Sequence, residues 1–183
     1  FRQCSNAGEA DFRGADLTGA TFCQRTCFTG ARMLAGATFS GSALNDTKFT
    51  NATLDRVSFA GCDLASTEFC GATLKDVCFD RARLPGPAMF SGVRVAGPLS
   101  FAQTTVPSVC LSGLSLRGFC FAGSVLDGAD LKNCNFDGAD LTGAVFAGVS
   151  FTGSALCFGG GSNNNNGSGG GGGYLAGFSV RPS

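Results

Sequence analysis

The chain has 183 residues, a formal net charge of zero and only 14% charged residues, against roughly 25% in an average soluble domain. This length suits one ordinary domain, and the neutral balance gives no electrostatic reason to expect nucleic acid or an acidic membrane as a partner. The apolar runs are too short to form a transmembrane segment.

Large apolar residues recur every five positions along most of the chain. These large apolar residues fall in three regular runs, one near the start, one from Phe39 to Leu84 and one from Phe101 to Leu156, with shorter irregular stretches between them. Two residues before each large apolar residue there is usually a small residue, as in Ala15-Asp16-Leu17-Thr18-Gly19. The five-residue unit is therefore small, polar, large apolar, polar, and polar or glycine.

A period of five fits neither a helix, which needs 3.6, nor a strand, which needs 2. The pattern makes physical sense if the chain turns a corner every five residues and points the small and the large residue of each unit inward. No single unit buries its side chains alone, so the units must stack, as they do in any solenoid.

The repeated motif A-(D/N)-L-x-x resembles that of the pentapeptide-repeat proteins, whose fold is a right-handed quadrilateral β-helix with four units to a coil. This resemblance implies an all-β solenoid of about seven coils over residues 1–158. Phe and Leu alternate strictly from Phe39 to Leu84. With four faces to a coil, this alternation predicts stacked Phe ladders on two opposite faces.

The repeat is interrupted at two slips, near residues 23–37 and 85–100. Pro85, Pro87 and Pro98 lie in the second slip. Because proline lacks the donor that a stacked coil needs, we interpret this slip as an outward bulge or a kink rather than as a domain boundary. Leu99, Leu114 and Phe119 stand at small positions, where we expect them to widen or distort the coil.

Residues 159–183 form a Gly/Asn-rich tail with an apolar end. Glycine loses the most backbone entropy on ordering, so such a tract is by default a flexible linker. We expect this tail to lie across a protein partner or to fold back along the rod. The candidate contact residues at its end are Tyr174, Leu175, Phe178, Val180 and Arg181.

The ten cysteines divide by their place in the repeat. Cys62 and Cys134 fall at inward small positions, where a thiol acts as a small apolar group. Cys4, Cys23 and Cys27 gather near the start. A disulfide among these three would secure the first coil and indicate an oxidising compartment, whereas free thiols throughout would indicate a reducing one; both remain open.

The sequence contains no candidate catalytic site. Histidine, the commonest general base, is absent. Carboxylates such as Asp130 and Asp140 recur because the second position of the unit favours Asp or Asn. The ten cysteines form no CxxC pair. We therefore expect no catalytic residues, no metal and no cofactor.

These features favour a non-enzymatic rod that scaffolds protein–protein contacts. The family resemblance suggests a linker subunit of a larger photosynthetic or organellar assembly in the chloroplast or thylakoid lumen; the bacterial cytoplasm and secretion are alternatives. A chain that starts at Phe1 is compatible with a removed targeting peptide, among other origins. The alternative function is a DNA-mimicking, gyrase-binding protein of the quinolone-resistance type. That mimicry needs a clearly acidic surface, which a zero net charge disfavours.

Overall fold

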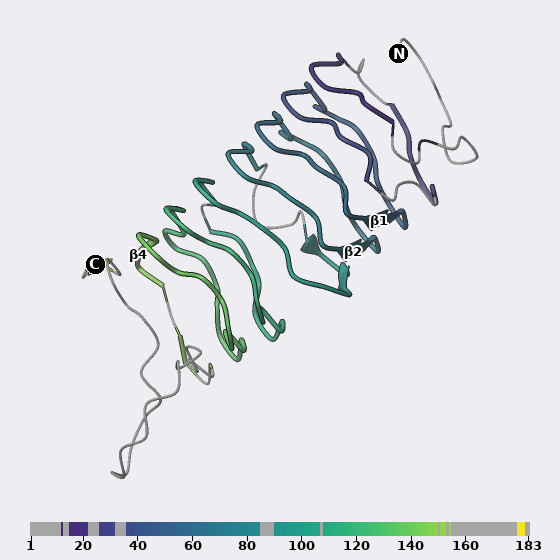
Figure 1. Ribbon diagram of the computed structural model, residues 1–183. Coiled ribbons are helices and arrows are strands. Elements are labelled where there is room, and N and C mark those ends of the chain that lie inside the picture. Colours follow the sequence, from purple (N-terminus) through teal and green to yellow (C-terminus); the bar gives the residue numbers. More distant parts are fainter. Residues whose placement is uncertain are drawn as a thin grey trace, which may run out of the picture.

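A computed structural model describes residues 12, 15–21, 26–31, 36–84, 90–106, 108–149, 151, 152 and 154, together with the backbone of 179–181. Successive coils of the chain stack into an elongated rod (Figure 1). Five short strands are present in the described part: β1 (Thr53–Asp55), β2 (Thr73–Lys75), β3 (Arg94–Val95), β4 (Val145–Ala147) and β5 (Ser179–Arg181). Strands β1, β2 and β3 form one parallel sheet in that order, and β4 pairs with β5 in parallel.

Single-residue β-bridges make up the rest of the solenoid, and their spacing establishes its four sides. The outward residue of each unit pairs with the outward residue four units later: Thr38 with Ser58, Ala43 with Asp63, and Lys48 with Glu68. Strand β1 pairs with β2 at the same separation, beginning with Thr53 and Thr73. Four units therefore complete one coil, which confirms the expected quadrilateral β-helix.

Hydrogen bonds between coils follow one pattern on every side. Leu44 N donates to Asp63 O at 3.0 Å, and Asp63 N donates to Ser42 O at 3.2 Å. Each coil thus bonds to the coil before it and the coil after it, as in a parallel sheet. The first and last coils are left with an unpaired edge unless another segment covers it.

The corners explain why the fifth position of the unit is so often glycine, asparagine or aspartate. Ser42 N donates to Phe39 O at 2.9 Å, closing a β-turn. The second central residue of that turn, Gly41, has a φ of 67°, and Asn51 takes the same place in another turn with a φ of 57°. Glycine adopts this left-handed backbone without strain, and asparagine tolerates it better than most residues.

Phenylalanine rings fill the interior in the two predicted ladders. On one face the rings of Phe39, Phe59 and Phe79 stack with centroids 5.3 and 5.4 Å apart. The opposite ladder meets the first edge-on, with Phe39 and Phe49 5.8 Å apart at 85°. Both arrangements are favourable for aromatic pairs. The expected ladders are therefore confirmed: Phe39, Phe59, Phe79, Phe101 and Phe121 stack on one face, and Phe28, Phe49 and Phe69 stack on the other. Phe90 meets Phe79 and Phe101 of the first ladder edge-on.

Some coils contain extra residues, and β-bridges to the neighbouring coil still form across them. Asp16 pairs with Thr38, and Cys78 pairs with Ser100, so each of these coils is longer than four regular units. On another face Thr73 pairs with Arg94, which again lies beyond the regular spacing. Each face thus resumes its own ladder on the far side of the added residues.

Large residues at small positions are accommodated in two ways. Leu99 and Phe119 are buried in the core, and the Phe119 ring lies tilted against Phe101 and Phe121. Leu114 is only half-buried and lines a surface cavity of about 570 Å³ together with Phe90. Whether these residues widen the coil stays a prediction, and the cavity marks where Leu114 meets Phe90 at the surface.

Candidate interaction surfaces

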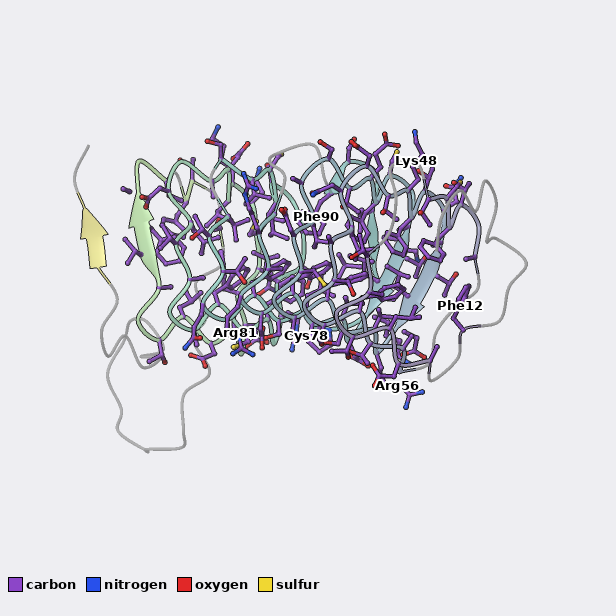
Figure 2. The ribbon with its side chains drawn as sticks, turned by 90° about the horizontal axis from the view of Figure 1, so that it is seen from above. Phe12, Lys48, Arg56, Cys78, Arg81 and Phe90 are labelled. Atoms are coloured by element: carbon purple, nitrogen blue, oxygen red, sulfur yellow. The ribbon has the colours of Figure 1, made fainter. Side chains whose placement is uncertain are left out.

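Four outward residues of a single coil, one on each face, define the surfaces that the rod offers. Ser100, Thr105, Cys110 and Ser115 all occupy bridge positions, so each points away from the core. Ser100 is half-buried and the other three are exposed. Side chains project from the rod along its length, with Arg56, Cys78 and Arg81 along one side and Lys48 across from them (Figure 2). The outward positions are thus free to vary while the inward ones form the core.

Charged residues on these faces cancel one another locally. The ion pairs Lys48–Glu68 and Arg83–Asp63, at 3.1 and 3.5 Å, each join residues on neighbouring coils. Lys75–Asp55 at 3.6 Å and Arg117–Asp137 at 2.6 Å join neighbouring coils in the same way. The basic side chains of these pairs are solvent-exposed and the carboxylates are exposed or half-buried, so each pair contributes little to stability. Their consequence is a neutral surface along much of the described rod.

The carboxylates at the second unit position have local partners. Asp16, Asp130 and Asp140 each accept a hydrogen bond from the backbone N–H two residues later, at 2.9 to 3.3 Å. Hydrogen bonding from Thr18 lowers the pKa of Asp16. Asp130 and Asp140 bridge to Cys110 and Cys120 on different faces, so they do not form a dyad. This arrangement stabilises the corner, as an Asx turn does.

Within the described ranges, no group of three or more Cys, Asp and Glu residues could hold a metal ion. The same part of the chain contains no helix of the length and apolarity needed to cross a membrane.

The two buried thiols confirm the inward positions expected of Cys62 and Cys134. Cys62 Sγ donates to Phe39 O at 2.8 Å, and Cys134 Sγ donates to Leu111 O at 3.0 Å. Burial raises the pKa of both thiols, that of Cys62 to about 11. Both side chains therefore act as neutral groups that bond to the coil before them.

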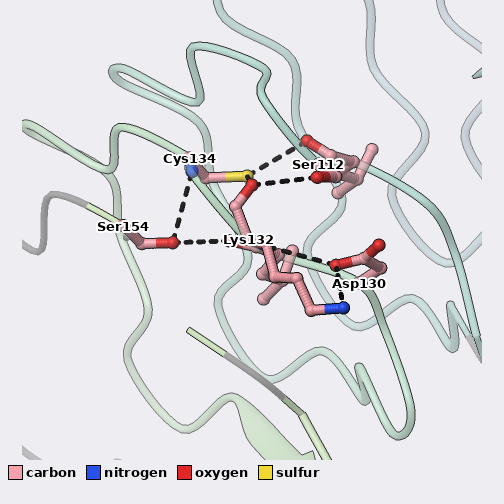
Figure 3. A network of polar contacts seen from close by, with 7 residues as sticks. Ser112, Asp130, Lys132, Cys134 and Ser154 are labelled. Atoms are coloured by element: carbon pink, nitrogen blue, oxygen red, sulfur yellow. Dashed lines mark hydrogen bonds and ion pairs between the residues drawn. The ribbon is translucent and has the colours of Figure 1, made fainter. Parts of the chain in front are cut away.

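Cys134 also belongs to a network that joins three coils (Figure 3). Ser154 Oγ accepts from Cys134 N at 3.2 Å and donates to Leu131 O at 2.5 Å. Lys132 O accepts from Ser112 Oγ at 3.1 Å. The network satisfies backbone groups near the last coils.

Thiol labelling should separate the cysteines by position. At pH 8, iodoacetamide should alkylate the exposed Cys70 and Cys110 rapidly, while Cys62 and Cys134 react only on unfolding, because burial disfavours the thiolate. Peptide mass spectrometry of the native and the urea-unfolded protein measures the difference.

The stabilising effect of the neutral Cys62 thiol is full below its unfolded pKa near 9.0 and is lost as the pH rises towards 11. Rapid labelling of Cys62 in the native protein at pH 8 would contradict its burial.

The predicted disulfide and tail residues fall mostly outside the described residues, namely Cys4, Cys23, Tyr174, Leu175 and Phe178. Cys27 carries a half-buried free thiol that donates to Thr29 Oγ1 at 3.0 Å. The disulfide among the three N-terminal cysteines stays a prediction.

Val180 and Arg181 lie in β5, which pairs with β4. Sequence reasoning treated these residues as contacts and missed the strand. The available signal was the alternation of polar and apolar residues in Ser179-Val180-Arg181. This stretch is too short to predict a strand by itself.

Stacked four-sided coils with a small and a large residue inward define a β-solenoid built from five-residue repeats. The family model for pentapeptide repeats matches eight copies, over residues 5–33, 34–66, 47–86, 110–148 and 124–157. The chain belongs to the pentapeptide-repeat family. No curated protein sequence matches it.

The chain also matches solved structures. QnrB1, a plasmid-mediated fluoroquinolone resistance protein, matches with a TM-score of 0.55 and 12% identity over 84% of this chain and 86% of its own. HetL, a pentapeptide-repeat protein involved in heterocyst differentiation regulation from the cyanobacterium Nostoc sp., matches with a TM-score of 0.37 and 20% identity over 85% and 86%. A pentapeptide-repeat protein from the thylakoid lumen of Arabidopsis thaliana matches with a TM-score of 0.26 and 23% identity over 77% and 68%.

Proposed function

We propose that this protein is a non-enzymatic scaffold that binds protein partners through one or more outward faces of its rod. The observation that carries this proposal is the separation of roles within each unit. Inward residues form a continuous core, while the outward residues of four faces vary and are accessible. A stack of this kind presents a long surface whose side chains are held at regular spacing, and such surfaces suit protein contacts.

The more specific role is a linker subunit in a larger assembly, with a photosynthetic or organellar setting as the working hypothesis. The neutral faces support a protein partner over a polyanion, because nucleic acid is bound chiefly by clusters of unpaired basic residues. The alternative, a DNA-mimicking gyrase-binding protein, requires rows of uncompensated carboxylates. The cross-coil pairs of Asp55, Asp63, Glu68 and Asp137 with Lys or Arg count against it.

The face that binds can be found with one lysine substitution per face of a single coil. The variants are Ser100→Lys, Thr105→Lys, Cys110→Lys and Ser115→Lys, each at an outward bridge position, so that the core is unchanged. Partners are first identified by co-purification from the native source, and the affinity of each purified partner is then measured by calorimetry. We expect at least a tenfold loss of affinity for the variant on the binding face, and no change for those on faces that do not contribute.

Equal affinity of all four variants would show that the partner does not bind at the faces of this coil, which is the outcome that counts against the proposal for that partner. Protection of gyrase supercoiling from a fluoroquinolone by the purified protein would favour the alternative function instead. Both measurements use the full chain.

A further inference from the structure

The pairing between successive coils is interrupted on one face of the rod. Strand β3 is the last strand of its sheet. Arg94 of β3 pairs with Thr73 in the coil before it, and in the described part it has no bridge to the coil after it. The ladder of this face resumes at Ser115, which bridges to Asn135. One edge of β3 is therefore open between two coils of the same rod.

The same two coils remain paired on two other faces. Ser100 bridges to Cys120, and Thr105 bridges to Val125, each with the regular spacing of one coil. The rod is thus continuous across the interruption, and the open edge of β3 is a local feature of one side.

The open edge leaves backbone groups without a partner. In the next coil the regular pattern is present, because Leu116 N donates to Asn135 O at 2.7 Å. The equivalent bond, from Val95 N to Ser115 O, does not occur among the described residues, and Ser115 N has no backbone acceptor there either. Unpaired groups along the edge of a sheet are a template for a further strand.

Apolar side chains at inward positions are partly exposed beside this edge. Val93, Val95 and Leu114 are each half-buried. By contrast, Leu74 and Leu116, which take the place of Val95 in the neighbouring coils, are fully buried. Partly exposed apolar side chains that lie together favour the binding of an apolar group.

The surface cavity of about 570 Å³ adjoins the same edge. One wall is formed by Phe90, Ser91, Gly92 and Val93, and the other by Cys110, Ser112 and Leu114 of the next coil. Phe90 lies near the middle of the rod (Figure 2). Pockets of roughly 300–1,000 Å³ hold drug-sized molecules, so this cavity has room for apolar side chains of a short peptide segment.

Arg94 adds a positive charge at the open edge. Its side chain is exposed, and it forms no ion pair with any described residue. On the same side of the rod, Lys75 and Arg117 are each paired with a carboxylate of a neighbouring coil. A binding partner that carries a carboxylate would complement the charge of Arg94.

We propose that the open edge of β3 is a docking site for an extended segment of a protein partner. The segment adds a strand beside β3, places an apolar side chain in the cavity and presents a carboxylate to Arg94. Successive side chains of a strand point to opposite faces, so apolar and acidic residues alternate in this segment. Main-chain hydrogen bonds supply affinity in this mode of binding, and the pockets supply specificity. This inference rests on the proposed function, because it names one site at which the scaffold binds a partner.

A set of blocked hexapeptides that alternate glutamate with valine, leucine or phenylalanine is the probe. Fluorescence anisotropy measures their binding to the full chain, up to about 1 mM, the weak end of specific affinities. We expect at least one peptide of the set to bind. Its counterpart with lysine in place of glutamate should bind at least tenfold more weakly, because lysine is repelled by Arg94.

Three variants and one control locate the site. Arg94→Glu reverses the charge, Ser91→Trp places a large side chain at the cavity, and Val95→Pro removes the donor at the open edge. Arg81→Glu is the matched control, because Arg81 is also exposed and forms no ion pair with a described residue. We expect each of the three variants to weaken binding at least tenfold and the control to leave it unchanged. Circular dichroism and thermal melting check that each variant keeps the rod.

Three results would each overturn the proposal. No peptide of the set could bind the wild type, Arg94→Glu could bind as tightly as Arg81→Glu, or Ser91→Trp and Val95→Pro could both bind as tightly as the wild type. None of these results would remove the scaffold function, because that function is tested with a purified partner and the lysine variants of the four faces. Failure of the docking site and failure of the scaffold are thus distinguishable.

Discussion

Replacing Phe59 with alanine should lower the free energy of unfolding by about 3–5 kcal/mol. Phe59 is fully buried and lies at the centre of the ladders. Its ring stacks on Phe39 and Phe79 at 5.3 and 5.4 Å and contacts Phe49 and Phe69 edge-on at 5.3 and 5.6 Å. The substitution removes four ring contacts and leaves a cavity that neighbouring coils, held by their own hydrogen bonds, cannot easily fill.

Urea unfolding of the wild type and the variant at 25 °C measures this loss. Phe151→Ala is the matched control, because Phe151 is half-buried near the end of the rod and its ring is tilted against those of Phe136 and Phe146. Its loss should be clearly smaller. A loss for Phe59→Ala below about 1 kcal/mol, the centre of the range for ordinary substitutions, would show that the ladder does not hold the coils together.

Proline substitution should distinguish the bridge position from the turn position within the same unit. Ser58 N donates to Ala37 O at 3.0 Å, in the interior of its face between Thr38 and Cys78. Ser58→Pro removes this donor and leaves the carbonyl of Ala37 unpaired. We expect a loss of at least about 2 kcal/mol of stability, because a buried unsatisfied group costs about 1–3 kcal/mol and the proline ring adds steric strain.

Ala60→Pro, two residues later, should change the stability by less than about 1 kcal/mol. Among the described residues, Ala60 N donates only to Ser58 Oγ, at 3.4 Å. Residue 60 is the first central residue of a turn, where the φ of proline is favoured. The native sequence already places Pro85 and Pro107 directly after the large residues Leu84 and Val106. Thermal and urea unfolding compare the two variants, and equal losses would contradict the separation of bridge and turn positions.

The amino-acid sequence by itself determined the repeat, the inward residues and the aromatic ladders. These follow from a local rule, because each unit of five residues turns one corner and buries its own small and large residue. Cys62 and Phe59 could therefore be placed in the core from their position in the unit alone. The same rule accounts for the recurrence of Asp130 and Asp140 at the second position of the unit.

Tertiary structure decided the features that depend on the contact of one coil with another. The Lys48–Glu68 pair is visible only when residues of successive coils are brought side by side, and the cavity beside Leu114 is lined by residues of two different coils. The β4–β5 pair joins two segments across a glycine-rich stretch with no periodicity. Backbone pairing at an open edge places this strand, and it needs no repeat in the sequence to do so.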